Sequence, residues 1–316
     1  MINKLNDSVM VKRLFPCFSY FLFLLLPYSC FSQSAKDTSH PKTQPSTWND
    51  ERLISSPTTK TVTPGAMEVY FMHRLGNMGG ASNGGFHTLY GFDIASDVLF
   101  GFDFGITKRL MIGVCRSKAQ ELIDVYGKYR LINQKPGGWP ISLALNQDIG
   151  VTPEDTTTLY HGTSEAENQR SISDRFSYLE QVIIDTRINK HISLEIVPTL
   201  CHRNHVLETV NYNNDTYDEN DIFSLGIGGR YMFNKVIGIV ADYYYIMSKY
   251  RTNNPYLNYY NALSCGIELN TGGHVFEINL SNASGLVGNN FIPNTTDTWL
   301  KGGFKLGFTI SRAFNI

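Results

Sequence analysis

The stretch GGFKLGFTISRAFNI, residues 302–316, separates two kinds of side chain at a period of two. The apolar parity holds Phe304, Leu306, Phe308, Ile310 and Phe314, and the small or polar parity holds Gly303, Lys305, Gly307, Thr309 and Ser311. Successive side chains of a β-strand point to opposite faces, so the stretch predicts a strand between an apolar and a polar environment. Lipid outside and a watery lumen inside would supply these two environments.

The same alternation recurs along the chain from Met67 onward, bounded by residues that favour turns. We count twelve such segments, at residues 67–75, 97–106, 110–117, 124–133, 141–150, 175–188, 192–203, 221–233, 236–247, 259–271, 274–282 and 303–314. An even number of strands is what an outer-membrane barrel of a single chain contains.

The connections between these segments alternate in length. Short ones lie at residues 107–109, 134–140, 189–191, 234–235 and 272–273, a moderate one at 118–123, and long ones at 76–96, 152–174, 204–220, 248–258 and 282–301. This rhythm predicts an all-β fold, a transmembrane antiparallel β-barrel of about 12 strands with short periplasmic turns and long external loops. A secreted β-sandwich or β-helix is the alternative, but it gives no reason for the alternation.

The composition agrees with a strand-rich protein and excludes some partners. Among 316 residues there are 18 Tyr, 19 Phe and 27 Gly, and 17% of the chain is charged. The net charge of -1 provides no field that would attract nucleic acid. Cys115, Cys201 and Cys265 lie singly in separate strands and predict no disulfide framework. We expect no cofactor.

The N-terminus has the features of an export signal. Lys12 and Arg13 precede an apolar run at residues 14–26, which is shorter than the roughly 18 to 20 residues of a spanning helix. We therefore predict a signal peptide at 1–33, a periplasmic tail or linker at 34–64 and the barrel at 65–316. Met10 is an alternative start to Met1, and a lipid anchor at Cys30 is an alternative to cleavage.

Strand parity places a nearly balanced set of charged side chains in the lumen. The predicted lumen-lining residues are Glu68, Arg74, Asp103, Lys128, Arg130, Asp148, Asp185, Arg187, Glu195, Arg203, Arg230, Asp242, Glu268, Glu277 and Lys305. Two interpretations stay open. The charges line a narrow water-filled pore that orients a small polar solute, or they form ion pairs that close the lumen. Glu180, His73 and His202 fall on the lipid parity and do not fit.

Motifs that carry chemistry are weak. HRNH at residues 202–205 holds two histidines, but a strand that runs into a loop puts them on different faces, and no metal-ligand spacing is present. GIGGR at residues 226–230 lies within a strand and precedes no helix, so small lumen-facing residues explain it. A hydrolase site on the outer wall would need His73 or His202 beside a serine, and no spacing supports it. We predict no catalytic, metal or cofactor residues.

Five segments, SNGGFHTLYGFD, VPTLCHRN, LGIGGRY, TGGHVF and ISRAF, together resemble an uncharacterised family of exported barrel proteins from Bacteroidota, domain of unknown function 5777. The likeness extends from about Arg52 to Ile316. It implies an outer-membrane β-barrel and supplies no catalytic or binding residues. Phe314 is followed by Asn315 and Ile316, a departure from the usual ending that bears on recognition by the barrel-assembly machinery.

These observations predict a porin-like protein of the bacterial outer membrane, a passive channel for small polar solutes and not an enzyme. A closed structural or surface-binding barrel, which contacts a partner through the loops at 152–174 and 204–220, is the alternative. An outer-membrane hydrolase is third. The expected partners are the lipid bilayer, the barrel-assembly machinery and a small polar solute.

Overall fold

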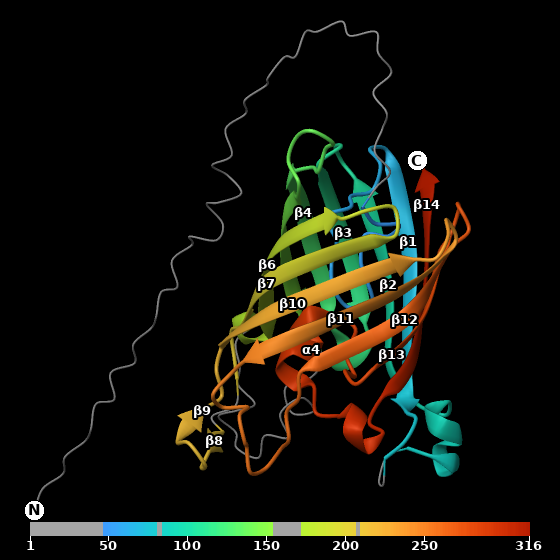
Figure 1. Cartoon of the computed structure of the whole chain (residues 1–316). Coiled ribbons are helices and arrows are strands. Elements are labelled where there is room, and N and C mark those ends of the chain that lie inside the picture. Colours follow the sequence, from blue (N-terminus) through green and yellow to red (C-terminus); the bar gives the residue numbers. More distant parts are fainter. Residues whose placement is uncertain (1–46, 81–83, 154–171, 207–208) are drawn as a thin grey trace, which may run out of the picture. The chain divides into compact units, whose positions relative to one another are not determined.

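Twelve strands form one closed antiparallel barrel in a computed structural model that describes residues 47–80, 84–153, 172–206 and 209–316 (Figure 1). The barrel strands are β1 (Ala66–Asn77), β2 (Ala95–Gly105), β3 (Leu110–Ser117), β4 (Ile123–Ile132), β5 (Ser142–Val151), β6 (Phe176–Arg187), β7 (Ile192–Arg203), β10 (Asp221–Met232), β11 (Ile237–Met247), β12 (Ala262–Asn270), β13 (Val275–Ser281) and β14 (Lys305–Asn315). The predicted number of strands is confirmed, and the predicted bounds of β3 and β7 coincide with those in the structure.

The barrel closes because the first and last strands pair with each other. Their register runs from Ala66 opposite Asn315 to Arg74 opposite Gly307. Each remaining neighbour is antiparallel, so no strand leaves an open edge whose backbone groups would need another partner. A closed barrel is one of the two architectures that satisfy every backbone group within a bilayer.

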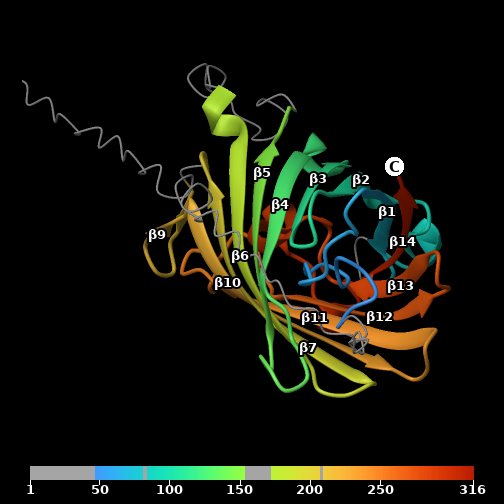
Figure 2. The same ribbon diagram turned by 90° about the horizontal axis from the view of Figure 1, so that it is seen from above.

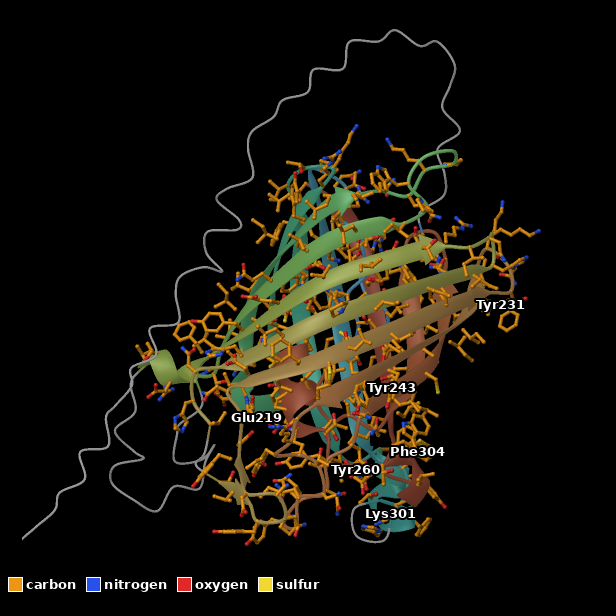
Figure 3. All side chains as sticks on the ribbon, turned by 60° about the vertical axis from the view of Figure 1, so that its left-hand side comes forward. Glu219, Tyr231, Tyr243, Tyr260, Lys301 and Phe304 are labelled. Carbon is orange, nitrogen blue, oxygen red and sulfur yellow. The ribbon has the colours of Figure 1, made fainter. Side chains whose placement is uncertain are left out.

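The two faces of the wall differ as the parity predicted. In β14, Lys305, Thr309 and Ser311 are buried, whereas Phe308 and Ile310 are exposed on the outer surface. Aromatic rings also lie near both strand ends on the outside. Figure 3 shows Tyr231 at one end of the strands and Tyr260 and Phe304 toward the other. Such rings suit the two membrane–water interfaces.

The predicted alternation of short turns and long loops is confirmed. In two of the short turns an asparagine side chain holds the backbone: Asn189 Oδ1 accepts hydrogen bonds from the amides of His191 and Ile192, and Asn234 Oδ1 does the same in the β10–β11 turn. Sequence periodicity did not predict the elements within the long loops. In the described part of these loops they are the hairpin of β8 (Val210–Asn211) and β9 (Thr216–Tyr217), helix α4 (Gly288–Asn294) and three short 3₁₀ turns, Phe86–Gly91, Ile172–Arg175 and Trp299–Lys301. A further 3₁₀ turn, Ala119–Glu121, lies in the moderate connection between β3 and β4.

Some predictions lie outside the described residues. The signal peptide at 1–33, the segment at 34–46 and the middle of the long loop at 152–174 belong to these parts of the chain. Among the residues that are described, no helix is long and apolar enough to cross a membrane.

Candidate functional site

Residues 47–64, which we call the N-terminal plug, lie inside the barrel. Figure 2, a view along the barrel, shows this blue segment enclosed by the strands. Its side chains Trp48, Leu53 and Ile54 are buried and pack with Val240 of β11. The N-terminal plug therefore occupies the short-turn half of the lumen, which it enters directly before β1.

Asp185 of β6 fixes two points of the N-terminal plug. Its Oδ2 accepts a hydrogen bond from Trp48 Nε1 at 2.6 Å, and from the amide and the hydroxyl of Thr59. Arg230 of β10 lies over the Trp48 ring, with its guanidinium carbon 5.3 Å from the ring centroid, and donates to the Thr47 carbonyl. The plug is therefore attached to β6 through the carboxylate of Asp185, which accepts several hydrogen bonds, and to β10 through Arg230.

Lys128 of β4 holds the backbone of the N-terminal plug. Its ammonium donates to the carbonyl oxygens of Glu51, Thr58 and Lys60, at 2.9, 3.0 and 2.9 Å. All three donors of the ammonium are thereby used. Asp103 of β2, two strands away from β4 in the barrel, forms a 2.9 Å ion pair with Arg52 of the plug.

Further contacts distribute the attachment around the barrel. Asn49 donates to Glu268 of β12, the Ser55 amide donates to Asp242 of β11, and Ser311 of β14 donates to Asp50. Together with the contacts above, the N-terminal plug is bonded to strands on all sides of the lumen. A segment that rested loosely in a pore would not satisfy so many inward-facing polar groups.

Charges within the N-terminal plug stabilise one another. Burial by itself raises the pKa of Glu51, but the ammonium of Lys60, 3.1 Å away, helps to hold it below its ordinary value. Conversely, burial lowers the pKa of Lys60, but the combined attraction of Glu51, Glu68 and Asp50 more than offsets this and raises the pKa above its ordinary value. Both groups are therefore held in their charged forms near neutral pH.

Residues 282–297, which we call the loop plug, lie in the other half of the lumen and contact its wall. Figure 1 shows their helix α4 within the barrel at the long-loop end. Arg74 of β1, which is fully buried, donates to the carbonyls of Ala283 and Gly285, at 3.3 and 2.7 Å. Asp97 of the adjacent strand β2, which pairs with Arg74, accepts from the Leu286 amide at 2.9 Å. Phe291 packs edge-on against Tyr244 of β11.

A cavity of about 80 Å³ remains between the two plugs. Its polar wall comes from β4, β5 and β6, which contribute Asp124, Asn146, Asp148 and Gln181. Residues of the N-terminal plug and residues 286–288 of the loop plug also line it. We call this space the lumen chamber.

The structure places the predicted lumen residues in two groups. The twelve that are buried are Glu68, Arg74, Asp103, Lys128, Asp148, Asp185, Glu195, Arg230, Asp242, Glu268, Glu277 and Lys305. Arg130, Arg187 and Arg203 lie at the strand ends and are partly exposed. Several buried members bind the two plugs. That these residues line a conducting pore stays a prediction.

In the HRNH motif, His202 contacts neighbouring polar side chains. His202 Nδ1 lies 2.7 Å from Asp221, and His202 Nε2 lies 3.1 Å from Asn204. Among the described residues, one set of three groups has the spacing of metal ligands: Asp50, Glu51 and Glu68, with oxygens within 4.8 Å of one another. Ser311 of β14 already binds Asp50, and Lys60 of the plug binds Glu51. These two carboxylates therefore serve the attachment of the plug to β14 and an ion pair within the plug.

The match to a family model places the chain among membrane barrels. The model of a family described as a membrane bound beta barrel domain (DUF5777) matches residues 48–314. Solved structures of low similarity include the NanC porin, at 8% identity and a TM-score of 0.46, covering 79% of this chain and 100% of NanC. The KdgM porin has the same identity and TM-score, and the match covers 78% of this chain and 99% of KdgM. No curated protein matches the sequence.

Proposed function

Because the chain belongs to the family of membrane bound beta barrel domains (DUF5777), we propose that it is an outer-membrane channel for small polar solutes with the N-terminal plug as its gate. In the described conformation the gate is shut. Transport would then need no chemical step. The strands would form the wall of the channel, and their charged side chains would line it. The outer membrane of a Bacteroidota species is the location that we propose, with a signal peptide at 1–33 for export.

The polar attachment of the N-terminal plug carries this proposal. Beside its apolar packing on Val240, the plug is bonded to the wall by hydrogen bonds and ion pairs through Lys128, Asp185 and Asp103. Water can take the place of the plug's polar groups on these side chains when the plug leaves. After that exchange the same side chains would line an aqueous path. An apolar plug would instead leave a lumen that water does not wet. The loop plug, by contrast, would form the constriction.

A closed barrel that binds a surface partner is the second candidate. Its support is the hairpin of β8 and β9, on which Tyr212 and Tyr217 are exposed. Asp218 fixes this hairpin through 2.9 Å ion pairs with Arg203 and Arg251. A rigid element that presents exposed aromatic rings is suited to protein recognition. This candidate requires no conduction at all, which separates it from the channel.

Replacement of Lys128 tests the gate without deleting it. Lys128→Met keeps the length of the side chain but removes three hydrogen bonds from the ammonium to the plug. Since charged hydrogen bonds contribute about 1.5 to 3 kcal/mol, we expect the open probability in planar bilayers to rise at least about tenfold. Single-channel recording of the refolded proteins measures this change.

Lys235→Met is the matched control, because Lys235 is exposed in the β10–β11 turn. Its open probability should equal that of the unmodified chain. If Lys128→Met folds, inserts and stays as silent as the control, the channel is the wrong function and the surface-binding barrel gains support.

A further inference from the structure

The lumen chamber contains buried polar atoms that the protein leaves without partners. Among the described residues, Asp124 Oδ1, Asn146 Oδ1 and Arg52 Nη1 are buried and make no hydrogen bond. All three residues line the chamber. A buried carboxylate oxygen that binds nothing costs free energy, so this arrangement calls for an occupant.

The carboxylates of Asp124 and Asp148 belong to one wall. Tyr126 pairs with Asp148 and Asp124 pairs with Gly150 across β4 and β5, so the two aspartates are diagonal neighbours on the same face. Asn146 lies two residues before Asp148, and its Nδ2 donates to Asp148 Oδ1 at 2.6 Å. Its Oδ1 takes no part in that hydrogen bond and has no partner among the described residues. Two carboxylates and an amide oxygen therefore offer acceptors from adjacent strands.

The charges that line the chamber do not cancel. Glu51 is paired with Lys60, and Arg52 with Asp103. Of the other charged lining residues, Asp124 and Asp148 are acidic and Lys128 is basic. One negative charge is thus uncompensated when both aspartates are ionised, and one monovalent cation would neutralise it.

The size and the apolar part of the lining decide what kind of cation fits. A volume of about 80 Å³ exceeds the roughly 10 to 15 Å³ that one water needs. Apolar side chains also line the chamber: Met72, Leu99, Leu286 and Val287, together with Ile54 and Leu179. These side chains would contact carbon atoms, whereas a bare alkali ion would gain nothing from them.

We propose that the lumen chamber is a binding site for a small organic ammonium ion, whose N–H groups donate to Asp124, Asp148 and Asn146. This inference rests on the proposed channel for its role, in which the chamber is the place where the solute pauses between the two plugs. The oxygens supply the three acceptors that a primary ammonium needs. The apolar lining residues, such as Leu99 and Leu286, contact the carbon atoms of the ammonium ion.

Equilibrium dialysis of radiolabelled methylammonium against the full chain, refolded with both plugs in place, tests the site. We expect saturable binding that potassium at equal concentration does not displace. Asp124→Asn removes the charge at nearly constant shape, and Asp148→Asn does the same on β5. Each should weaken binding at least about tenfold, because an ionic hydrogen bond is lost.

Glu121→Gln is the control, since this exposed carboxylate precedes Asp124 by three residues and lies outside the chamber. It should bind like the unmodified chain, and heat-modifiable mobility on gels should show all variants folded. Absence of saturable binding, equal displacement by potassium, or unchanged binding by both aspartate variants would overturn the proposal. Binding without conduction would instead refute the channel and keep the site.

Discussion

Phe102→Arg should prevent most of the protein from assembling in the membrane. Phe102 lies on the outer face of β2 between Phe100 and Phe104, with ring centroids 4.8 and 6.5 Å away. Its lateral partners are Val69 of β1 and Val114 of β3, so the position lies within the apolar band. An arginine facing lipid near the middle of the bilayer costs about 2 to 4 kcal/mol. The folded fraction, measured by heat-modifiable mobility of membrane extracts, should fall steeply.

The same substitution at Phe233 is the matched control. Phe233 is exposed directly after β10, at the short-turn end, where an arginine can reach the interface. There the cost is about 0 to 1 kcal/mol, and Phe233→Arg should assemble like the unmodified chain. If Phe102→Arg and Phe233→Arg assemble equally well, the outer face of β2 is not in contact with lipid.

Trp48→Ala should release the N-terminal plug while the barrel stays folded. Trp48 is 1% exposed, donates to Asp185 and packs with Leu53 and Ile54. Removal of such a buried ring costs about 3 to 5 kcal/mol. Because proteolysis follows the population of the open form, trypsin should cut after Arg52 and Lys60 at least tenfold faster than in the unmodified chain. Mass spectrometry of the fragments identifies these two cuts.

Trp139→Ala provides the control, because Trp139 is 62% exposed in the turn between β4 and β5. Its cleavage pattern should equal that of the unmodified protein. Rapid cleavage at Arg52 and Lys60 in the unmodified, folded barrel would show that the plug is not seated in the lumen under the conditions of the assay.

Strand parity predicted the barrel because every strand faces the same two environments. The period of two in residues 302–316 recurs in β2, where Phe102 is outward and Asp103 is buried. The strands of a barrel pair with neighbours in the sequence, except where β1 meets β14. Local patterns therefore determine most of the topology, and the alternating loop lengths supply the rest.

The two plugs have no such local pattern. Residues 47–64 follow no strand or helix period, and their Ser, Thr and Pro content is also typical of a linker. They fold through contacts with partners distant in the sequence, such as Arg52 with Asp103, 51 positions away, and Trp48 with Asp185, 137 positions away. The loop plug holds apolar residues, Phe291 and Ile292, within a long loop. Trp48, Phe291 and Ile292 were the signals in the sequence that could have indicated the two plugs. Large apolar side chains within polar segments are expected to pack against another part of the protein.

Conductance of a variant that lacks residues 47–64 tests the central claim most directly. This deletion leaves Gly65, whose amide bonds to Gly105, and the whole pairing of β1 with β14 in place. In planar bilayers we predict frequent discrete current steps from the variant and long silent periods from the unmodified chain. A variant that is folded and inserted but as silent as the unmodified chain would contradict the proposal that the N-terminal plug gates a channel.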